Sequence, residues 1–310
     1  MNTNSNVYTV IYSTVLVVVV AAVLAFAAMS LKPMQDENVK IETITKVLTA
    51  ATQSDDAVSV AEDTDVMRMY ADRITDAFYV DGYGKKVGEM NMGKTDLKDI
   101  VVASTADLKK QNDLIKQIEA GKTDLLAKLA LPVYIFDING KKVTVMPCYG
   151  AGLWGPIWGY IAVAADGRTL EGAIFDHKSE TPGLGAKITE EFFYSQFKGK
   201  SFGEGDVKFD VVKGGAKGAS NAVDAISGAT ITSRALGSTI NVWAKYYAPF
   251  LKASAVACED ASCGKTCCDG TCCDASESKM QKELPEGCCG ACDGTGCPEQ
   301  AEKLKAMEEK

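Results

Sequence analysis

The chain has 310 residues, with 33 Lys and Arg against 41 Asp and Glu, so its formal net charge is −8. This acidic balance argues against nucleic acid as a partner, because phosphate backbones attract basic surfaces. His177 is the single histidine, which excludes a His-rich metal site and any catalytic triad built on another histidine. Residues 258–310 hold −6 of the net charge, so the rest of the chain is nearly neutral.

The N-terminal segment is predicted to be a membrane span. Residues 7–31 carry no charged side chain, and residues 15–29 are wholly apolar. A helix of this length reaches roughly 37 Å, enough to cross a bilayer core about 30 Å thick. A cleaved signal peptide is the alternative, since residues 25–27 have a small-x-small pattern, but no Lys or Arg precedes the apolar run. The lysines that follow the span weakly favour a cytoplasmic body.

The remaining elements predict an α+β fold, with antiparallel strands packed against helices. Apolar residues at helical spacing predict helices over residues 41–48, 60–79, 106–120, 190–197 and 230–250, with a linker over 51–59. Turn residues at Asn139-Gly140 and Asp166-Gly167 predict two β-hairpins, because these residue types tolerate tight turns. The hairpins cover residues 133–146 and 160–175, and a further strand is expected over 207–212.

The segment from Asp224 to Ser233 has small residues before a helical pattern. One interpretation is a helix start capped by Ser or Thr. The other is an anion site, because free N–H groups and the helix dipole favour a phosphate at this position. Gly228 and Ala229 would let a ligand approach the backbone closely. Lys213 is either a cation near that phosphate or an ordinary solvated lysine.

Two further segments are rich in glycine. Residues 152–159 hold Trp154 and Trp158 among glycines and a proline. Their indoles are either buried at the edge of the core or available to stack on a flat ring. Residues 177–185 contain a turn signal at Pro182-Gly183.

Together these segments, in order behind one anchor, resemble the FMN-binding domain family. This domain occurs in the C subunit of the sodium-translocating NADH:quinone reductase and in the G subunit of the related Rnf complex. Ser227-Gly228-Ala229-Thr230 looks like the flavinylation motif, and residues 177–185 resemble the family's His-x-x-Glu-Thr-Pro-Gly-Leu-Gly segment. The resemblance implies that FMN is joined through its phosphate to Thr230, supplied from FAD by a flavin transferase. Thr232 is the nearest competitor, and only its position in the motif argues against it.

The resemblance also implies which residues surround the flavin. Leu184 would pack on the isoalloxazine, Thr181 would bond its polar edge, and Glu180 and His177 would hold the loop in shape. The other implied cofactor-binding residues are Ser227, Gly228, Ala229, Gly185, Trp154, Trp158 and Lys213. No residue is expected to be catalytic or to bind a metal.

Four parts are predicted, of which the tail departs from the family's pattern. These are a transmembrane anchor (1–31), a juxtamembrane and helical region (32–130), the FMN-binding domain (131–255) and an acidic Cys-rich tail (256–310). The chain would be a single-pass subunit of a reductase in the bacterial inner membrane, with its anchor in contact with lipid. It would not be catalytic alone and would relay electrons between partner subunits. Its body would face the periplasm despite the weak lysine bias, since long domains translocate largely regardless of charge. The G subunit of an Rnf-type complex is the nearest alternative.

Ten of the 11 cysteines lie in the tail, between Cys258 and Cys297. An even number suits disulfides in an oxidising compartment, and metal or iron–sulfur ligation is the rival interpretation. The spacing matches no ferredoxin run, and disulfides or disorder are favoured. A membrane-anchored metal-binding or thiol-redox protein is therefore the more distant alternative. Cys148 stands apart and is predicted to be a small buried residue.

Overall fold

The computed structural model describes residues 6–55, 60, 65–202 and 208–261. The α-helices are α1 (Asn6–Thr52), α2 (Val66–Arg73), α3 (Thr105–Glu119), α4 (Glu191–Tyr194) and α5 (Thr230–Ala261). The strands are β1 (Ile74–Val80), β2 (Lys86–Glu89), β3 (Leu131–Ile138), β4 (Lys141–Ala151), β5 (Pro156–Ala164), β6 (Leu170–His177), β7 (Asp210–Val212) and β8 (Ala222–Asp224). Short 3₁₀ segments are η1 (Leu97–Asp99), η2 (Thr123–Lys128), η3 (Gly185–Thr189) and η4 (Ser195–Phe197). This arrangement confirms the predicted α+β class.

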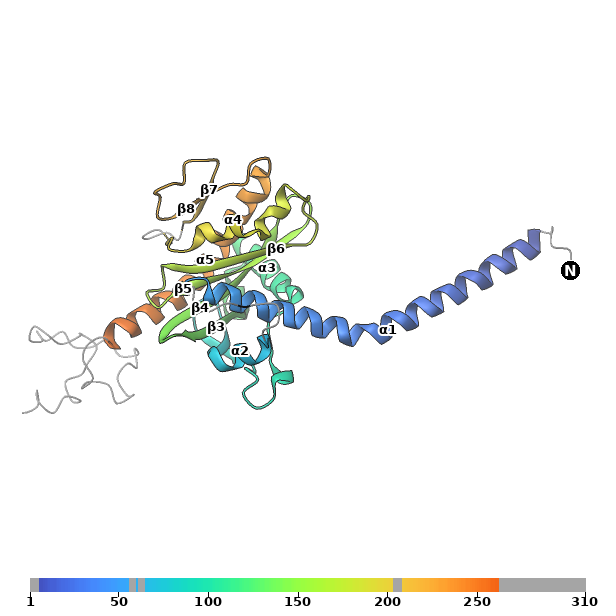
Figure 1. The fold of residues 1–310 in the computed structure, drawn as a ribbon, viewed down its shortest axis with the longest axis horizontal. Helices are drawn as coiled ribbons and strands as arrows, with labels where there is room; N and C mark the ends of the chain where they lie inside the picture. Colours follow the sequence, from blue (N-terminus) through green and yellow to red (C-terminus); the bar gives the residue numbers. More distant parts are fainter. Residues whose placement is uncertain (1–5, 56–59, 61–64, 203–207, 262–310) are drawn as a thin grey trace, which may run out of the picture.

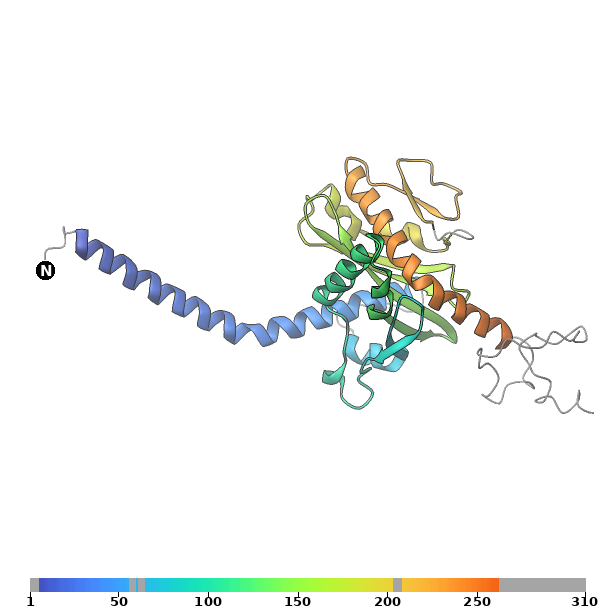
Figure 2. The same ribbon diagram turned by 180° about the vertical axis from the view of Figure 1, so that it is seen from behind.

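Six strands form an antiparallel sheet in the order β2-β1-β3-β4-β5-β6. The end of α1 and α2 lie over one face (Figure 1), and α3 and α5 lie over the other (Figure 2). Successive residues of a strand point to opposite faces. In β3, Val133 and Ile135 therefore enter the core beneath α3 and α5, whereas Tyr134 and Phe136 enter the core beneath α1 and α2. The sheet is thus buried on both sides.

Both predicted hairpins are present. Asn139 and Gly140 join β3 to β4 with φ values of 53° and 80°, the positive values that a tight hairpin turn requires. Between β5 and β6, one carboxylate oxygen of Asp166 accepts the N–H groups of Arg168 at 2.8 Å and Thr169 at 2.9 Å. Both turns are therefore stabilised by the local chemistry that the sequence indicates.

Helix α1 has two different halves. Its N-terminal half projects from the body (Figures 1 and 2) and exposes its apolar side chains, and it is long and apolar enough to cross a membrane. Its C-terminal half packs on the sheet and buries Ile44, Val47 and Leu48 completely. Pro33 lies inside the helix and removes one backbone hydrogen bond. The predicted juxtamembrane helix is therefore continuous with the span.

The helix predicted over residues 60–79 is wrong in its second half. Among the described residues of this range, Val66–Arg73 is helical, and Ile74–Val80 forms β1, which pairs with β3. Residues 74–80 pair with the nearby β2 and with β3, which lies more than fifty positions along the chain, and periodicity within one segment cannot reveal such partners. The predicted linker also starts too early, since α1 continues to Thr52, and residues 56–59 lie outside the described residues.

Four other predictions concern helices, a strand, Cys148 and the Cys-rich tail. Helices α3, α4 and α5 lie where the sequence predicts helices, and β7 covers the end of the strand expected over 207–212. Cys148 is buried as predicted, and burial raises the pKa of its thiol to about 12. The Cys-rich tail lies outside the described residues, apart from the backbone of α5 up to Ala261.

Candidate functional site

Glu180 joins the three segments that the sequence analysis singled out. This carboxylate is only 4% exposed. Its Oε1 accepts the backbone N–H of Trp154 at 2.9 Å, and its Oε2 accepts the hydroxyl of Thr232 at 2.7 Å. Its own N–H donates to Nδ1 of His177 at 3.2 Å. One buried side chain therefore connects the turn after β4, the loop after β6 and the start of α5.

Two glycines make room for this carboxylate. A Cβ atom on Gly152 would lie 2.5 Å from Oε1 of Glu180, and a Cβ atom on Gly185 would lie 2.4 Å from its Oε2. Neither distance is tolerable for a carbon atom, so any larger residue would push the segments apart. Gly185 thus has a packing role that the sequence alone does not reveal.

The loop after β6 is a turn, as Pro182-Gly183 predicts. The carbonyl oxygen of Thr181 accepts the N–H groups of Leu184 and Ala186, both at 3.1 Å, and Gly183 has a φ of 76°. The loop is also tied to the turn after β4, because the Ser179 hydroxyl donates to the carbonyl of Trp154 at 3.0 Å. The side chains of Thr181 and Leu184 are left exposed on this anchored loop.

The start of α5 presents four hydroxyl groups in two different environments. Thr232 is 1% exposed and donates to Glu180. Ser233 is also buried, donates to the Ala229 carbonyl at 2.9 Å and accepts the Ile226 N–H at 3.1 Å. Ser227 is exposed and Thr230 half-buried, and within the described chain neither hydroxyl makes a hydrogen bond. The structure therefore does not support a side-chain cap at Ser227 or Thr230.

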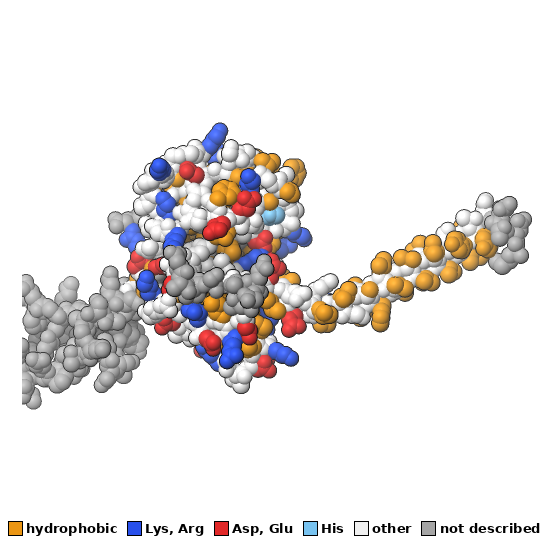
Figure 3. Space-filling view, in the orientation of Figure 1, with side chains coloured by type: hydrophobic (Ala, Val, Ile, Leu, Met, Phe, Trp, Pro, Cys, Tyr) orange, Lys and Arg blue, Asp and Glu red, His pale blue; other side chains and the backbone are white. Residues whose placement is uncertain are grey.

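Several apolar side chains on the segments that Glu180 joins face solvent. Trp154 is 67% exposed and Ile231 62%, and Leu153 and Leu184 are also exposed. Leu184 lies against the turn before α5, since a Cβ atom on Gly228 would be 3.0 Å from its Cδ2. Figure 3 shows hydrophobic side chains at the surface of the upper part of the body. The large exposed area of Trp154 rules out the interpretation in which its indole is buried.

Trp158 and Lys213 differ from Trp154 in their surroundings. Trp158 lies in β5 opposite Asp176, is half-buried, and packs against both hydrophobic cores. Its place at the edge of the core agrees with the interpretation in which this indole is buried there. Lys213 is exposed and directly follows β7, whose last residue, Val212, accepts the N–H of Ala225 at 2.6 Å. This bond brings the Lys213 backbone beside the segment that leads to Ser227.

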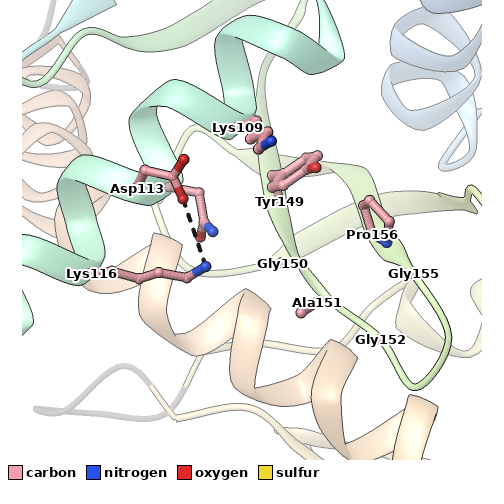
Figure 4. Close-up of a pocket in the computed structure, with 10 residues that line it drawn as sticks. Lys109, Asp113, Lys116, Tyr149, Gly150, Ala151, Gly152, Gly155 and Pro156 are labelled. Carbon is pink, nitrogen blue, oxygen red and sulfur yellow. Dashed lines mark ion pairs between the residues drawn. The ribbon is translucent and has the colours of Figure 1, made fainter.

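A cavity of about 320 Å³ lies beside the turn after β4 (Figure 4). Lys109 and the ion pair between Asp113 and Lys116, 3.7 Å apart, line it from α3, and Tyr149 lines it from β4. Burial, followed by the nearby Asp113, raises the pKa of the Tyr149 hydroxyl. None of the predicted site residues lines this cavity.

Sequence reasoning does not reveal three features of the site. The first two are the bonds from Glu180 to Trp154 and Thr232. Their partners lie far apart in the chain, so no local pattern signals them. The third is the exposure of Leu153 and Ile231. Helical spacing alone places Ile231 on the buried side of the last helix, and only the packing of α5 turns it outward.

Comparisons with known proteins agree with this geometry. A family model described as an FMN-binding domain matches residues 152–245, which include all three segments. The C subunit of the Na(+)-translocating NADH-quinone reductase from Pasteurella multocida is 38% identical over 125 residues, 38% of this chain and 48% of that protein. The chain thus spans about half the length of that relative. The same subunit from Vibrio vulnificus is 30% identical over 190 residues, 55% of this chain and 74% of that protein.

A solved structure extends the comparison to most of the folded body. The crystal structure of the C subunit of the Na(+)-translocating NADH-quinone reductase from Parabacteroides distasonis is 31% identical, with a TM-score of 0.54. The match covers 71% of this chain and 96% of that one. Sequence and fold therefore agree over the region that holds the site. The chain belongs to the family of C subunits of the Na(+)-translocating NADH-quinone reductase.

Proposed function

We propose that this chain carries FMN esterified through its phosphate to Thr230 and relays electrons between other subunits of a membrane-bound NADH:quinone reductase. The observation that carries the proposal is the contrast between the two threonines of the motif. The hydroxyl of Thr232 is buried and donates to Glu180. The hydroxyl of Thr230 is partly accessible at the first residue of α5.

The residues present fit an FMN at this position. The first N–H groups of a helix have no partners within the helix, and they favour a phosphate. Leu184, Trp154 and Ile231 present exposed apolar surface on the segments that Glu180 joins to the start of α5, and a flat ring could cover it. Burying such exposed apolar area is favourable by about 25 cal/mol per Å².

Each residue of the site would have a distinct task. Thr230 would hold the phosphate, with Ser227, Gly228 and Ala229 shaping the turn beside it. Leu184, Gly185 and Trp154 would line the ring, and Thr181 would form a hydrogen bond to its polar edge. Trp158, which is part of β5 and packs against both hydrophobic cores, would hold that strand in place. Lys213 would place a positive charge near the phosphate. Bound FMN would supply the electron-transfer chemistry, and the protein would set its position and access.

Attachment would be a phosphoryl transfer catalysed by a separate flavin transferase. The oxygen of Thr230 forms a bond to the FMN phosphorus of FAD, the bond to the bridging oxygen breaks, and AMP leaves with the proton of the hydroxyl. No oxidation is involved, so the reaction needs only FAD and the transferase. This chain would contribute the acceptor, the Thr230 hydroxyl, at an accessible helix start.

The partner subunits and the membrane follow from the family. The relatives are subunits of a Na(+)-translocating NADH-quinone reductase, which favours this complex over the Rnf-type alternative.

The apolar half of α1 would lie in lipid of the inner membrane, with the body on the periplasmic side. Protease added to spheroplasts should digest the body, and a protected body would place it in the cytoplasm.

The test is the mass of the mature chain and of its variants. Protein produced with its native flavin transferase should be heavier by one FMN less one water, and the added mass should lie on the peptide that holds Thr230. Thr230→Val should abolish both the added mass and in-gel flavin fluorescence. Thr232→Val, which removes a hydroxyl of the same type two residues away, should keep both. Flavin on Thr230→Val protein would reject the assigned residue.

A further inference from the structure

The end of α1 is joined to β6 by two sets of side-chain bonds. The ammonium of Lys46 forms an ion pair with Asp176 on β6 and another with Glu42 at 2.6 Å. Seven residues later, the Gln53 amide donates to the Ala173 carbonyl at 2.8 Å and accepts the Ala173 N–H at 2.9 Å. The helix that continues the membrane span is therefore fixed to the strand that leads into the site.

The pair between Lys46 and Asp176 differs from an ordinary surface ion pair. The two side chains are only 19% and 20% exposed. Burial opposes the charged form of Lys46, but its bonds to Asp176 and Glu42 outweigh this and raise its pKa. Exposed pairs contribute little to stability, whereas removing one partner of a mostly buried pair leaves an uncompensated charge.

Asp176 extends this contact into the loop that holds the site. Its Oδ2 binds Lys46, while its Oδ1 accepts the backbone N–H of His177 at 2.7 Å. The ring of His177 accepts the N–H of Glu180, and the Glu180 carboxylate accepts the Trp154 N–H and the Thr232 hydroxyl. Consecutive bonds thus run from the membrane helix to the first turn of α5.

We propose that Lys46 is a positioning residue for the flavin site, acting through Asp176, His177 and Glu180 to hold that site in one orientation relative to the membrane helix. The part that concerns flavin rests on the proposed function. An electron carrier between membrane-bound subunits has to present its cofactor at a defined place, and sites on rigid elements hold their geometry better than sites on free loops. The body is therefore a fixed extension of its anchor.

Hydrogen exchange on the full chain in detergent tests the coupling without flavin. In Lys46→Met, Asp176 loses its cation and can turn toward solvent, which releases the His177 N–H. Exchange at His177, Glu180 and Trp154 should rise about tenfold, because local opening becomes easier. Lys46→Arg, which keeps the positive charge, should restore the slow exchange.

Lys40→Met is the matched control. Lys40 lies on the same helix and donates to the carbonyl of Lys98 at 2.6 Å, so it also attaches α1 to the body but has no bond to the network. Exchange at the three amides should stay unchanged in this variant. An unchanged rate in Lys46→Met, or an equal rise in Lys40→Met, would overturn the proposal.

The second readout is the rate at which the flavin transferase modifies Thr230. Lys46→Met should slow the transfer about threefold or more, because the acceptor segment is less ordered, whereas Lys46→Arg and Lys40→Met should react like the wild type. Faster exchange with an unaltered transfer rate would show that the network does not position the flavin site. If the wild type accepts no FMN, the proposed function fails, and the exchange experiment still decides the coupling.

Discussion

At the scale of single residues, Glu180 is the side chain that connects the segments of the site. A buried carboxylate is costly unless its oxygens are bonded, and both oxygens of Glu180 have partners from other segments. This arrangement explains why two glycines face it. Because Glu180 accepts the Thr232 hydroxyl, the two threonines of the motif differ in their hydrogen bonding. Thr232 is bonded and buried, whereas the Thr230 hydroxyl has no partner in the described part of the chain.

Replacing Glu180 with Gln should therefore destabilise the site. A glutamine offers one acceptor oxygen where two are needed, and its NH₂ group would face a donor. The free energy of unfolding should fall by about 1–3 kcal/mol, the cost of leaving a buried polar group unsatisfied. Urea unfolding followed by circular dichroism measures this. Glu190→Gln, an exposed position nearby, should change it by less than about 0.5 kcal/mol, and equal effects of both variants would contradict this role.

At the scale of elements, the contact between α1 and β6 depends on close approach of two backbones. Gly172 on β6 faces the end of α1, and a Cβ atom there would lie 2.5 Å from the carbonyl oxygen of Ala50. The end of helix α1 therefore lies directly against β6. A small residue at this position is a requirement of packing.

Gly172→Ala should push α1 away from β6. Overpacking of this kind costs about 1–3 kcal/mol, and the bonds of Gln53 to Ala173 should weaken with it. The midpoint of thermal unfolding and the exchange of the Ala173 N–H would report the change. Gly88→Ala on the edge strand β2 is the control, since its Cβ would meet Tyr79 at an ordinary 3.6 Å. A stable Gly172→Ala protein with slow exchange would refute the tight contact.

At the scale of the whole molecule, the second half of α1 belongs to the folded body. Ile44, Val47, Leu48 and Ala51 fill the core on one face of the sheet, together with Tyr70 of α2. The functional boundary between anchor and body therefore lies within one continuous helix, before these buried residues. The division predicted at residue 131 stays a prediction, while β1 and β2, which precede it, are part of the sheet.

Truncation at two points tests this boundary. A chain that begins at residue 32 loses the apolar half of α1 and should be soluble, monomeric and folded. A chain that begins at residue 54 also loses the buried half, exposes one face of the sheet and should aggregate. Size-exclusion chromatography and circular dichroism distinguish the outcomes. A well-folded monomer from the shorter chain would show that the end of α1 is dispensable for the body.

The sequence by itself determined the features that depend on local chemistry. The uncharged run, the turns at Asn139-Gly140 and Asp166-Gly167, and the helix that begins at Thr230 lie where they were predicted. Each is encoded within a short stretch, by hydrophobicity, by positive φ at a turn or by helical spacing. The motif residues could be identified for the same reason, because their order along the chain is itself the signal.

Only the tertiary structure decided how these pieces act together. It turned residues 74–80 into a strand through pairing with β3, left Trp154 exposed, buried Thr232 against Glu180 and joined Lys46 to Asp176. These outcomes depend on partners far away in the chain, and burial or a hydrogen bond exists only once both partners are in place. The sequence therefore identified the candidate residues, and packing determined which of them solvent and a cofactor can reach.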